Sequence, residues 1–327
     1  MIKRRATISS SAMKPISFER EREIGENTVM LPSPPPYREI MGWDLPINHQ
    51  RWEIPDDILS EREYDEMDQE DRMDYMRRET LRRQRGYWFY NHGNIEYLTG
   101  DHYFYLTYWR IDGSIPYWKD SDADFFYMDM YVYNLKPCLG WMQITNRRDG
   151  KTGKSTSLIY NRATLNMNAN CGIQSKTNGD AKGIFRKLVL SWQKLPHYMK
   201  PTDSGVSFPS ADLKFQEPSK RSSEGKKKDY KTVLNSVIDY KPATEEAYDG
   251  YKMKFYYDDE FGKLTESNAH ERWLITKECL VEGEMVVGKS IHTTTVEEME
   301  DKGGYNAKLL WDESDLEASQ KTGRDFT

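Results

Sequence analysis

Two consecutive triplets of glycine, lysine and a hydroxyl residue are the residues of this sequence best suited to chemistry. Gly150-Lys151-Thr152 and Gly153-Lys154-Ser155 lie within the string ITNRRDGKTGKST. In such a loop, backbone N–H groups bind phosphates, the lysine reaches the outer phosphates, and the hydroxyl group binds Mg²⁺. The usual first glycine is replaced by Thr145 or Arg148, depending on the register. The pattern indicates a phosphate loop but leaves open which triplet binds phosphate, and a surface turn is the alternative.

Three acidic residues follow an apolar run and could serve a bound Mg²⁺ ion. The run 255–257 leads into Asp258, Asp259 and Glu260. An aspartate at the end of a strand beside a phosphate loop can hold Mg²⁺, and a glutamate directly after it can orient the attacking water. We expect Asp259 to be the magnesium ligand and Glu260 the catalytic acid. Asp258 remains open as the alternative magnesium ligand.

A polar tip ends a third apolar segment, in the string EMVVGKSIHTTT. Its last residues are Thr293, Thr294 and Thr295. The order of loop, acids and polar tip is typical of ATPases in which one strand is inserted between the loop strand and the acid strand. We therefore expect an α/β fold of the P-loop NTPase type (the ASCE group).

The elements that must position these residues alternate between strands and helices. The sequence predicts a buried strand over 139–145, helices over 155–167 and 180–195, and strands within 252–263 and 284–295. Strands separated by helices favour a mainly parallel central sheet flanked by crossover helices. Residues 136–327 would form this core.

The residues before the core predict an appendage to it. Residues 1–54 contain LPSPPPYREI and indicate an extended, proline-containing arm. Residues 55–135 would form a helical and aromatic subregion, with one long helix over 55–85 and short strands or a hairpin in 86–111. A further helix is expected over 117–134.

Composition excludes several classes of protein. The 327 residues carry a net charge of −6 and contain no apolar run near the roughly 20 residues needed to cross a membrane. Cys138, Cys171 and Cys279 are odd in number and widely spaced, which argues against disulfides and zinc. A reducing cytoplasm, without membrane contact, is the expected compartment. A basic run over 220–231 is the candidate DNA contact, although a solvated loop explains it equally well; its candidates are Lys220, Arg221, Lys226, Lys227 and Lys228.

The motifs together resemble the N-terminal ATPase domain of large terminases of tailed bacteriophages, particularly those of crAss-like phages. TNRRDGKT is similar to that family's irregular phosphate loop, in which an arginine stands three residues before the glycine. The strings DEFGK, with Asp259 and Glu260, and GYWFYNHGNIEYLTGDHYFYL are similar to further segments of such proteins. The resemblance implies that Arg147 is an arginine finger, and that Gly150, Lys151 and Thr152 bind the phosphates. It also implies that Thr293, Thr294 and Thr295 are the coupling motif, which links the state of the nucleotide to movement. In the second register no arginine stands three positions before the glycine, so the identity of the finger stays open.

The resemblance also implies a function, cofactors and partners. It implies an ATP-hydrolysing motor that uses ATP and Mg²⁺ to move double-stranded DNA into a procapsid in the host cell cytoplasm. The implied partners are the portal protein, the small terminase subunit and further copies of this chain in a ring of unknown size. Large terminases also carry a C-terminal nuclease, for which the 32 residues after Thr295 are too few. We therefore expect no nuclease activity, and interpret the chain as a truncated reading frame or one piece of a longer or split protein.

Two rival functions remain open. Another P-loop translocase or a helicase-like ATPase would share the same core, but a helicase needs a second domain of the same type. A non-enzymatic phage structural protein with an accidental Gly-Lys-hydroxyl string would bind no nucleotide.

Overall fold

The chain divides into two units, each with its own sheet. One unit contains Met1–Trp109 and Ile115–Tyr131, and the other contains Arg110–Ser114 and Val132–Thr327. The computed structural model describes residues 17–18, 21–25, 27–36, 40–43, 52–91, 94–216, 233–264, 267–295 and 302–314.

The first unit contains a four-stranded sheet in the order β1-β6-β5-β4. β5 and β6 form an antiparallel hairpin, while β1 and β4 pair with them in parallel. A separate antiparallel hairpin is formed by β2 and β3. The strands are β1 (Ser17–Phe18), β2 (Glu21–Ile24), β3 (Asn27–Met30), β4 (Met41–Trp43), β5 (Tyr87–Asn91) and β6 (Asn94–Leu98). The helices are α1 (Glu61–Glu66), α2 (Gln69–Arg85), α3 (Gly100–Thr107) and α4 (Asp120–Asn134), of which α4 continues into the second unit.

Two sequence predictions for the first unit are wrong in detail. The single helix expected over 55–85 is two helices, because Met67 is extended and the Asp68 side chain accepts the Asp71 N–H to start α2. The aromatic stretch is a β-hairpin only in its first half. Thr99 then caps α3 by accepting the His102 N–H, so the following aromatic residues are helical.

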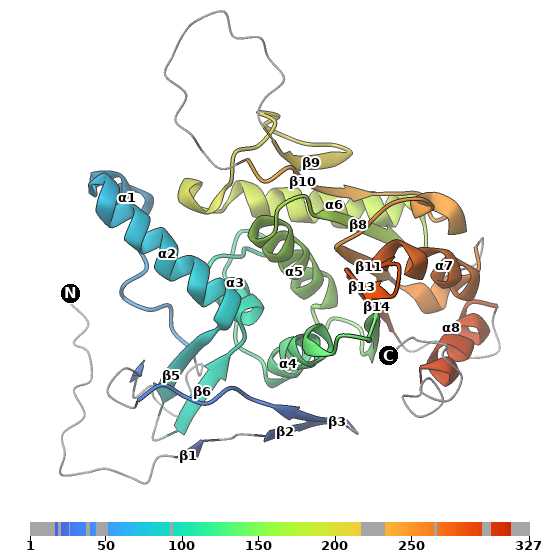
Figure 1. The fold of residues 1–327 in the computed structure, drawn as a ribbon, viewed down its shortest axis with the longest axis horizontal. Helices are drawn as coiled ribbons and strands as arrows, with labels where there is room; N and C mark the ends of the chain where they lie inside the picture. Colours follow the sequence, from blue (N-terminus) through green and yellow to red (C-terminus); the bar gives the residue numbers. More distant parts are fainter. Residues whose placement is uncertain are drawn as a thin grey trace, which may run out of the picture. The chain divides into compact units, whose positions relative to one another are not determined.

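The second unit contains a six-stranded sheet in the order β7-β14-β11-β8-β10-β9 (Figure 1). All neighbouring strands are parallel except β9, which is antiparallel to β10. The predicted α/β architecture with a mainly parallel sheet is therefore confirmed. The strands are β7 (Gly140–Thr145), β8 (Asn170–Ser175), β9 (Asp212–Phe215), β10 (Ser236–Tyr240), β11 (Phe255–Asp259) and β14 (Lys289–Thr295), with a short hairpin of β12 (Val281–Glu282) and β13 (Met285–Val286).

Helices cover both faces of this sheet. On one face lie α5 (Lys151–Leu165) and α6 (Asn178–Gln193), which follow β7 and β8. The other face carries α7 (Ala269–Thr276) and α8 (Lys302–Glu313) over a core that includes Tyr256, Phe261 and Trp273. Short 3-10 turns complete the unit at His197–Met199, Glu245–Tyr248, Phe261–Lys263 and Lys277–Leu280.

The boundaries of several predicted elements in this unit shift. The helix expected from residue 155 begins at Lys151, because Gly150 adopts a left-handed conformation with φ 83° and starts the helix directly. The strand expected over 284–295 is interrupted, and β14 begins only at Lys289. Among the described helices, none combines the length and apolar character that a membrane crossing requires.

Candidate nucleotide-binding site

Three parallel strands end at the same edge of the large sheet and bring the predicted motifs together. β14 lies between β7 and β11, with Thr295 paired to Thr145 and Thr293 paired to Asp259. The carboxyl ends of the loop strand, the threonine strand and the acid strand are therefore adjacent. This is the inserted-strand order that the sequence predicts.

The loop after β7 leads into the N-terminus of a long helix. Both Arg148, with φ 70°, and Gly150, with φ 83°, adopt left-handed conformations in this loop. Gly150 has no side chain with which to cap α5, so the first-turn N–H groups of a 15-residue helix receive no cap from that residue. A helix N-terminus with such a loop favours an anion such as phosphate.

Lys151, the first residue of α5, reaches the acidic end of β11. Its Nζ lies 2.6 Å from Glu260 Oε1 and 3.6 Å from Asp259 Oδ1. Because Lys151 is nearly buried, these contacts form in a place with little solvent screening. The structure therefore joins the first triplet to both predicted acids.

The lysine of the second triplet has a different partner. Lys154 is fully buried, and its Nζ lies 2.8 Å from Asp149 Oδ2. This ion pair closes the loop onto the first turn of α5. Of the two predicted lysines, the structure thus places Lys151 at the acids and Lys154 within the loop.

The hydroxyl residues of the triplets differ in burial. Thr152 is partly exposed at the start of α5. Ser155 is fully buried, and the Tyr257 hydroxyl is its neighbour. Gly153 packs closely against Ile111, whose Cδ1 would lie 2.5 Å from an added Cβ. A side chain at this position would therefore require the end of the Ile111 side chain to move.

Glu260 is held in a strained conformation by three side chains. Its φ is 57°, in the left-handed region that non-glycine residues rarely occupy. Besides Lys151, Lys263 Nζ lies 3.0 Å from Glu260 Oε2 and Thr295 Oγ1 donates to the same oxygen at 3.3 Å. Burial acts to raise the pKa of Glu260, but the contacts with both lysines outweigh it and lower the pKa below its usual value. The carboxylate is therefore ionised at neutral pH.

Asp259 is buried with fewer stabilising contacts. Its Oδ1 accepts a hydrogen bond from Thr293 Oγ1 at 2.8 Å, and Thr293 Oγ1 also lies 3.2 Å from the Tyr257 hydroxyl. Burial, together with the charge of Glu260, raises the pKa of Asp259 despite the opposing effects of Lys151 and Thr293. A cation close to Asp259 would stabilise the ionised form of this buried carboxyl group.

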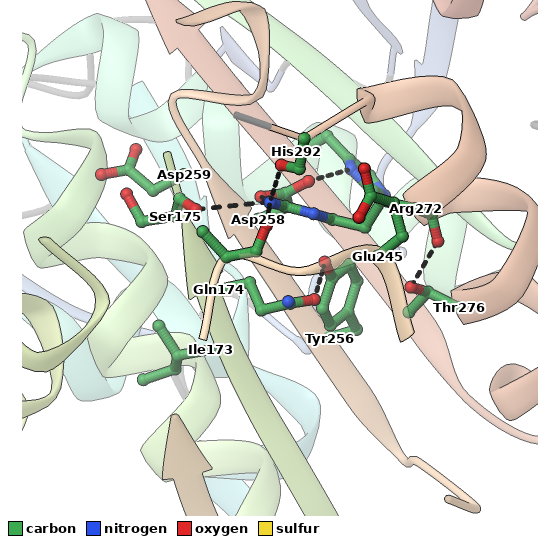
Figure 2. A network of polar contacts seen from close by, with 12 residues as sticks. Ile173, Gln174, Ser175, Glu245, Tyr256, Asp258, Asp259, Arg272, Thr276 and His292 are labelled. Atoms are coloured by element: carbon green, nitrogen blue, oxygen red, sulfur yellow. Dashed lines mark hydrogen bonds and ion pairs between the residues drawn. The ribbon is translucent and has the colours of Figure 1, made fainter. Parts of the chain in front are cut away.

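Asp258 points to the opposite face of the sheet and belongs to a different network. Figure 2 shows it facing Arg272 from α7, whereas Asp259 points away from that arginine. Arg272 Nη1 donates to Asp258 Oδ1 at 2.9 Å, and His292 Nδ1 lies 3.6 Å from Oδ2. Alternation along β11 thus turns the Asp258 carboxylate away from the loop, so the structure favours Asp259 over Asp258 as the candidate metal ligand.

The remaining predicted residues lie in several places. Arg147 and Arg148 are exposed on the loop, and Thr294 is buried, with its Oγ1 donating to the Thr295 carbonyl at 3.3 Å. The predicted DNA contacts, Lys220, Arg221, Lys226, Lys227 and Lys228, lie outside the described residues. Sequence reasoning missed Lys263, although its position three residues after Glu260 in the string DEFGK was the available signal.

The side chains at this edge fit Mg²⁺ with a phosphate ligand. Mg²⁺ is usually bound through one or two carboxylates, with water and phosphate oxygens as its other ligands. Asp259 offers a carboxylate with a raised pKa, and Thr152 offers a partly exposed hydroxyl in the first turn of α5. No group of three or more His, Cys, Asp and Glu residues able to hold a metal ion occurs in the described ranges. The donor set therefore suits a metal that arrives with its phosphate rather than one held by protein alone.

Comparison with known proteins finds similarity to a solved structure but not to a sequence family. The sequence matches no protein-family model and no curated protein. Among solved structures, the crystal structure of the HK97 bacteriophage large terminase is similar to this chain, with a TM-score of 0.47 and 12% sequence identity. The similarity covers 68% of this chain and 41% of that chain, so the chain spans less than half the length of that terminase.

Proposed function

We propose that this protein hydrolyses ATP with Mg²⁺ and that hydrolysis moves double-stranded DNA into a phage procapsid. The observation that carries the ATPase part is the meeting of Lys151 with Glu260 at 2.6 Å and Asp259 at 3.6 Å. These residues come from a helix N-terminus and from a strand end that β14 separates from the loop strand. A lysine, a metal-binding aspartate and a water-orienting glutamate are the side chains that phosphoryl transfer to water requires.

Each residue has a role in this reaction. Lys151 and the N–H groups at the start of α5 bind the outer phosphates, with Gly150, Gly153 and Arg148 shaping the loop around them. Asp259 and Thr152 hold Mg²⁺, which neutralises charge on the phosphate oxygens when bound. The buried side chains of Ser155 and Lys154 support the loop, and Lys154 does so through its ion pair with Asp149.

Glu260 and Arg147 act on the reacting atoms. The lowered pKa of Glu260 keeps it an ionised acceptor, so it orients the attacking water by a hydrogen bond. Arg147, exposed on the loop, stabilises the charge that develops on the transferred phosphoryl group. Thr293, Thr294 and Thr295 transmit the loss of that group, since Thr293 contacts Asp259 and Thr295 contacts Glu260.

The motor part of the proposal is supported by the resemblance of the motifs to large terminases. We propose that the chain acts in the host cell cytoplasm as a ring of identical subunits, together with a portal protein and a small terminase subunit. Contacts with DNA go mainly to phosphates, because packaging has no sequence preference. Lys220, Arg221, Lys226, Lys227 and Lys228 are the candidates for those contacts.

The test is Mg²⁺-dependent ATP hydrolysis by the full chain, with and without double-stranded DNA, alongside equilibrium binding of ATP. We expect Lys151→Ala to lower both binding and hydrolysis, and Glu260→Gln to keep binding but lower hydrolysis by about 100-fold or more. For Lys154→Met the urea unfolding midpoint is measured, because we expect Lys154 to stabilise the loop and not to bind the phosphates. Lys252→Met is the control, since Lys252 pairs with Glu282 before β11 begins, at the other end of that strand. Failure of the wild type to bind or hydrolyse ATP would favour a structural protein instead.

A further inference from the structure

The backbone at Glu260 is constrained, as is that of Arg148 in the loop. A non-glycine residue with φ 57° persists only where its surroundings hold it in place. The residue also connects the last residue of β11, Asp259, to the 3-10 turn Phe261–Lys263. Any loss of the contacts around Glu260 therefore frees both its side chain and its backbone.

The two carboxylate oxygens of Glu260 have separate partners. Oε1 is bound by Lys151 at 2.6 Å, whereas Oε2 is bound by Lys263 at 3.0 Å and by Thr295 at 3.3 Å. Under the proposed function, Lys151 must also bind the outer phosphates. When it does so, Glu260 depends on the contacts of Oε2.

Lys263 is firmly attached to the segment that it holds. Its backbone N–H donates to the Glu260 carbonyl at 2.9 Å, and its side chain is mostly buried. Gly262 brings the turn against the tip of β14, because a Cβ there would lie 2.9 Å from Thr294 Oγ1. The turn, its lysine and the threonine tip are thus packed together on one side of Glu260.

We propose that Lys263 is a positioning residue for Glu260, which keeps the glutamate oriented while Lys151 is engaged with phosphate. This inference rests on the proposed ATPase function and deepens it. Lys263 contacts Oε2 and leaves Oε1 for the attacking water. In the nucleotide-free protein, Lys151 and Lys263 both contact the Glu260 carboxylate. When nucleotide binds, Lys151 moves its contact to the phosphates, and Lys263 remains at the carboxylate.

The proposal predicts a separation between rate and affinity. In Lys263→Met, Glu260 loses the lysine at Oε2, and we expect kcat to fall about 10-fold while the Kd for ATP changes less than about threefold. Lys263→Arg, which keeps a charged donor, should recover most of the rate. In the Glu260→Gln background the further effect of Lys263→Met should vanish, because a positioning residue acts only through the group it positions.

A second measurement does not depend on activity. Hydrogen exchange of the backbone over 260–264, recorded with Mg²⁺ and a non-hydrolysable ATP analogue, should be faster in Lys263→Met than in the wild type. Lys252→Met, which breaks an exposed ion pair with Glu282 before β11, should change neither exchange nor kcat. If Lys263→Met does not fold, Lys263→Gln serves in its place with the same expectations.

The outcomes distinguish this inference from the proposed function. A wild type that binds no ATP would overturn both. A wild type that hydrolyses ATP, with kcat of Lys263→Met within twofold and unchanged exchange, would overturn the inference alone. An equal loss of kcat in the Glu260→Gln background would also overturn it, because Lys263 would then act independently of Glu260.

Discussion

The two neighbouring aspartates at the end of β11 lie on opposite faces of one strand and have different partners (Figure 2). Asp258 is buried and bound by Arg272 at 2.9 Å, with His292 nearby at 3.6 Å. Asp259 is also nearly buried, but Thr293 is its hydrogen-bond donor at 2.8 Å and the nearest lysine nitrogen, on Lys151, lies 3.6 Å away. The same residue type, one position apart, thus meets a complete set of partners in one case and an incomplete set in the other.

The difference extends to the pKa values of the two carboxyl groups. Burial alone would raise the pKa of Asp258, but Arg272 and His292 outweigh it and the pKa is lowered. Burial also raises the pKa of Asp259, and there the neighbouring Glu260 adds to the effect while Lys151 and Thr293 only partly oppose it. A buried acid that already has its counter-ion is costly to separate from it, whereas one that lacks a counter-ion is suited to binding a cation.

The largest expected effect comes from breaking the complete pair. Arg272→Met leaves Asp258 buried without its guanidinium and removes donors to the Ala243 carbonyl and Ser267 Oγ. We expect a loss of about 3–5 kcal/mol in the free energy of unfolding, measured with urea in the absence of nucleotide. The double variant Asp258→Leu/Arg272→Met should recover much of that loss, because no charge is then left unpaired. A loss below about 1 kcal/mol in Arg272→Met would contradict the structural role of this pair.

The incomplete pair should respond in the opposite way. Because burial raises the pKa of Asp259, its charge opposes folding at neutral pH, and Asp259→Asn should unfold within about 1 kcal/mol of the wild type or be more stable. Its defect should appear with ligand instead. Mg²⁺–ATP at about 100 times its Kd should stabilise the wild type by about 2.7 kcal/mol, and Asp259→Asn much less. Asp258→Asn is the control on the other face, and an equal ligand effect in Asp259→Asn and the wild type would remove Asp259 from the metal site.

Sequence alone could predict the edge of the sheet but not the two sides of β11. The order of the Gly-Lys-Thr triplet, the acids and the threonine tip is visible in the sequence, and parallel strands bring such ends together. Alternation also says that Asp258 and Asp259 face opposite ways. The sequence does not say which of them faces the loop. That depends on Arg272, 14 residues after Asp258, because the packing of α7 buries this arginine against Asp258.

Local backbone geometry accounts for the other differences. The sequence contains two equivalent candidate lysines, Lys151 and Lys154. Because Gly150 is left-handed, α5 starts at Lys151, and this start places Lys151 and not Lys154 at the acids. The extended Met67 similarly divides the long helix predicted in the first unit. Lys263 was missed because the string DEFGK gives its spacing from Glu260 but does not reveal the 3-10 turn that brings the two side chains together.

The smallest expected effect compares two neighbouring tyrosines on the two faces of β11. Tyr256 donates to Gln174 Oε1 at 2.8 Å, and Tyr257 lies 3.2 Å from Thr293 Oγ1. Tyr256→Phe should cost about 1–2 kcal/mol of unfolding free energy, because it leaves a buried amide oxygen without that donor, and should leave ATP hydrolysis unchanged. Tyr257→Phe should cost only about 0.5 kcal/mol, since Thr293 keeps Asp259 as its acceptor. It should nevertheless slow hydrolysis a few-fold, because Thr293 is held less firmly beside Asp259. Urea unfolding and steady-state kinetics of both variants test this. If Tyr257→Phe lost more stability and Tyr256→Phe lost more activity, the two faces of β11 would not differ in the way proposed.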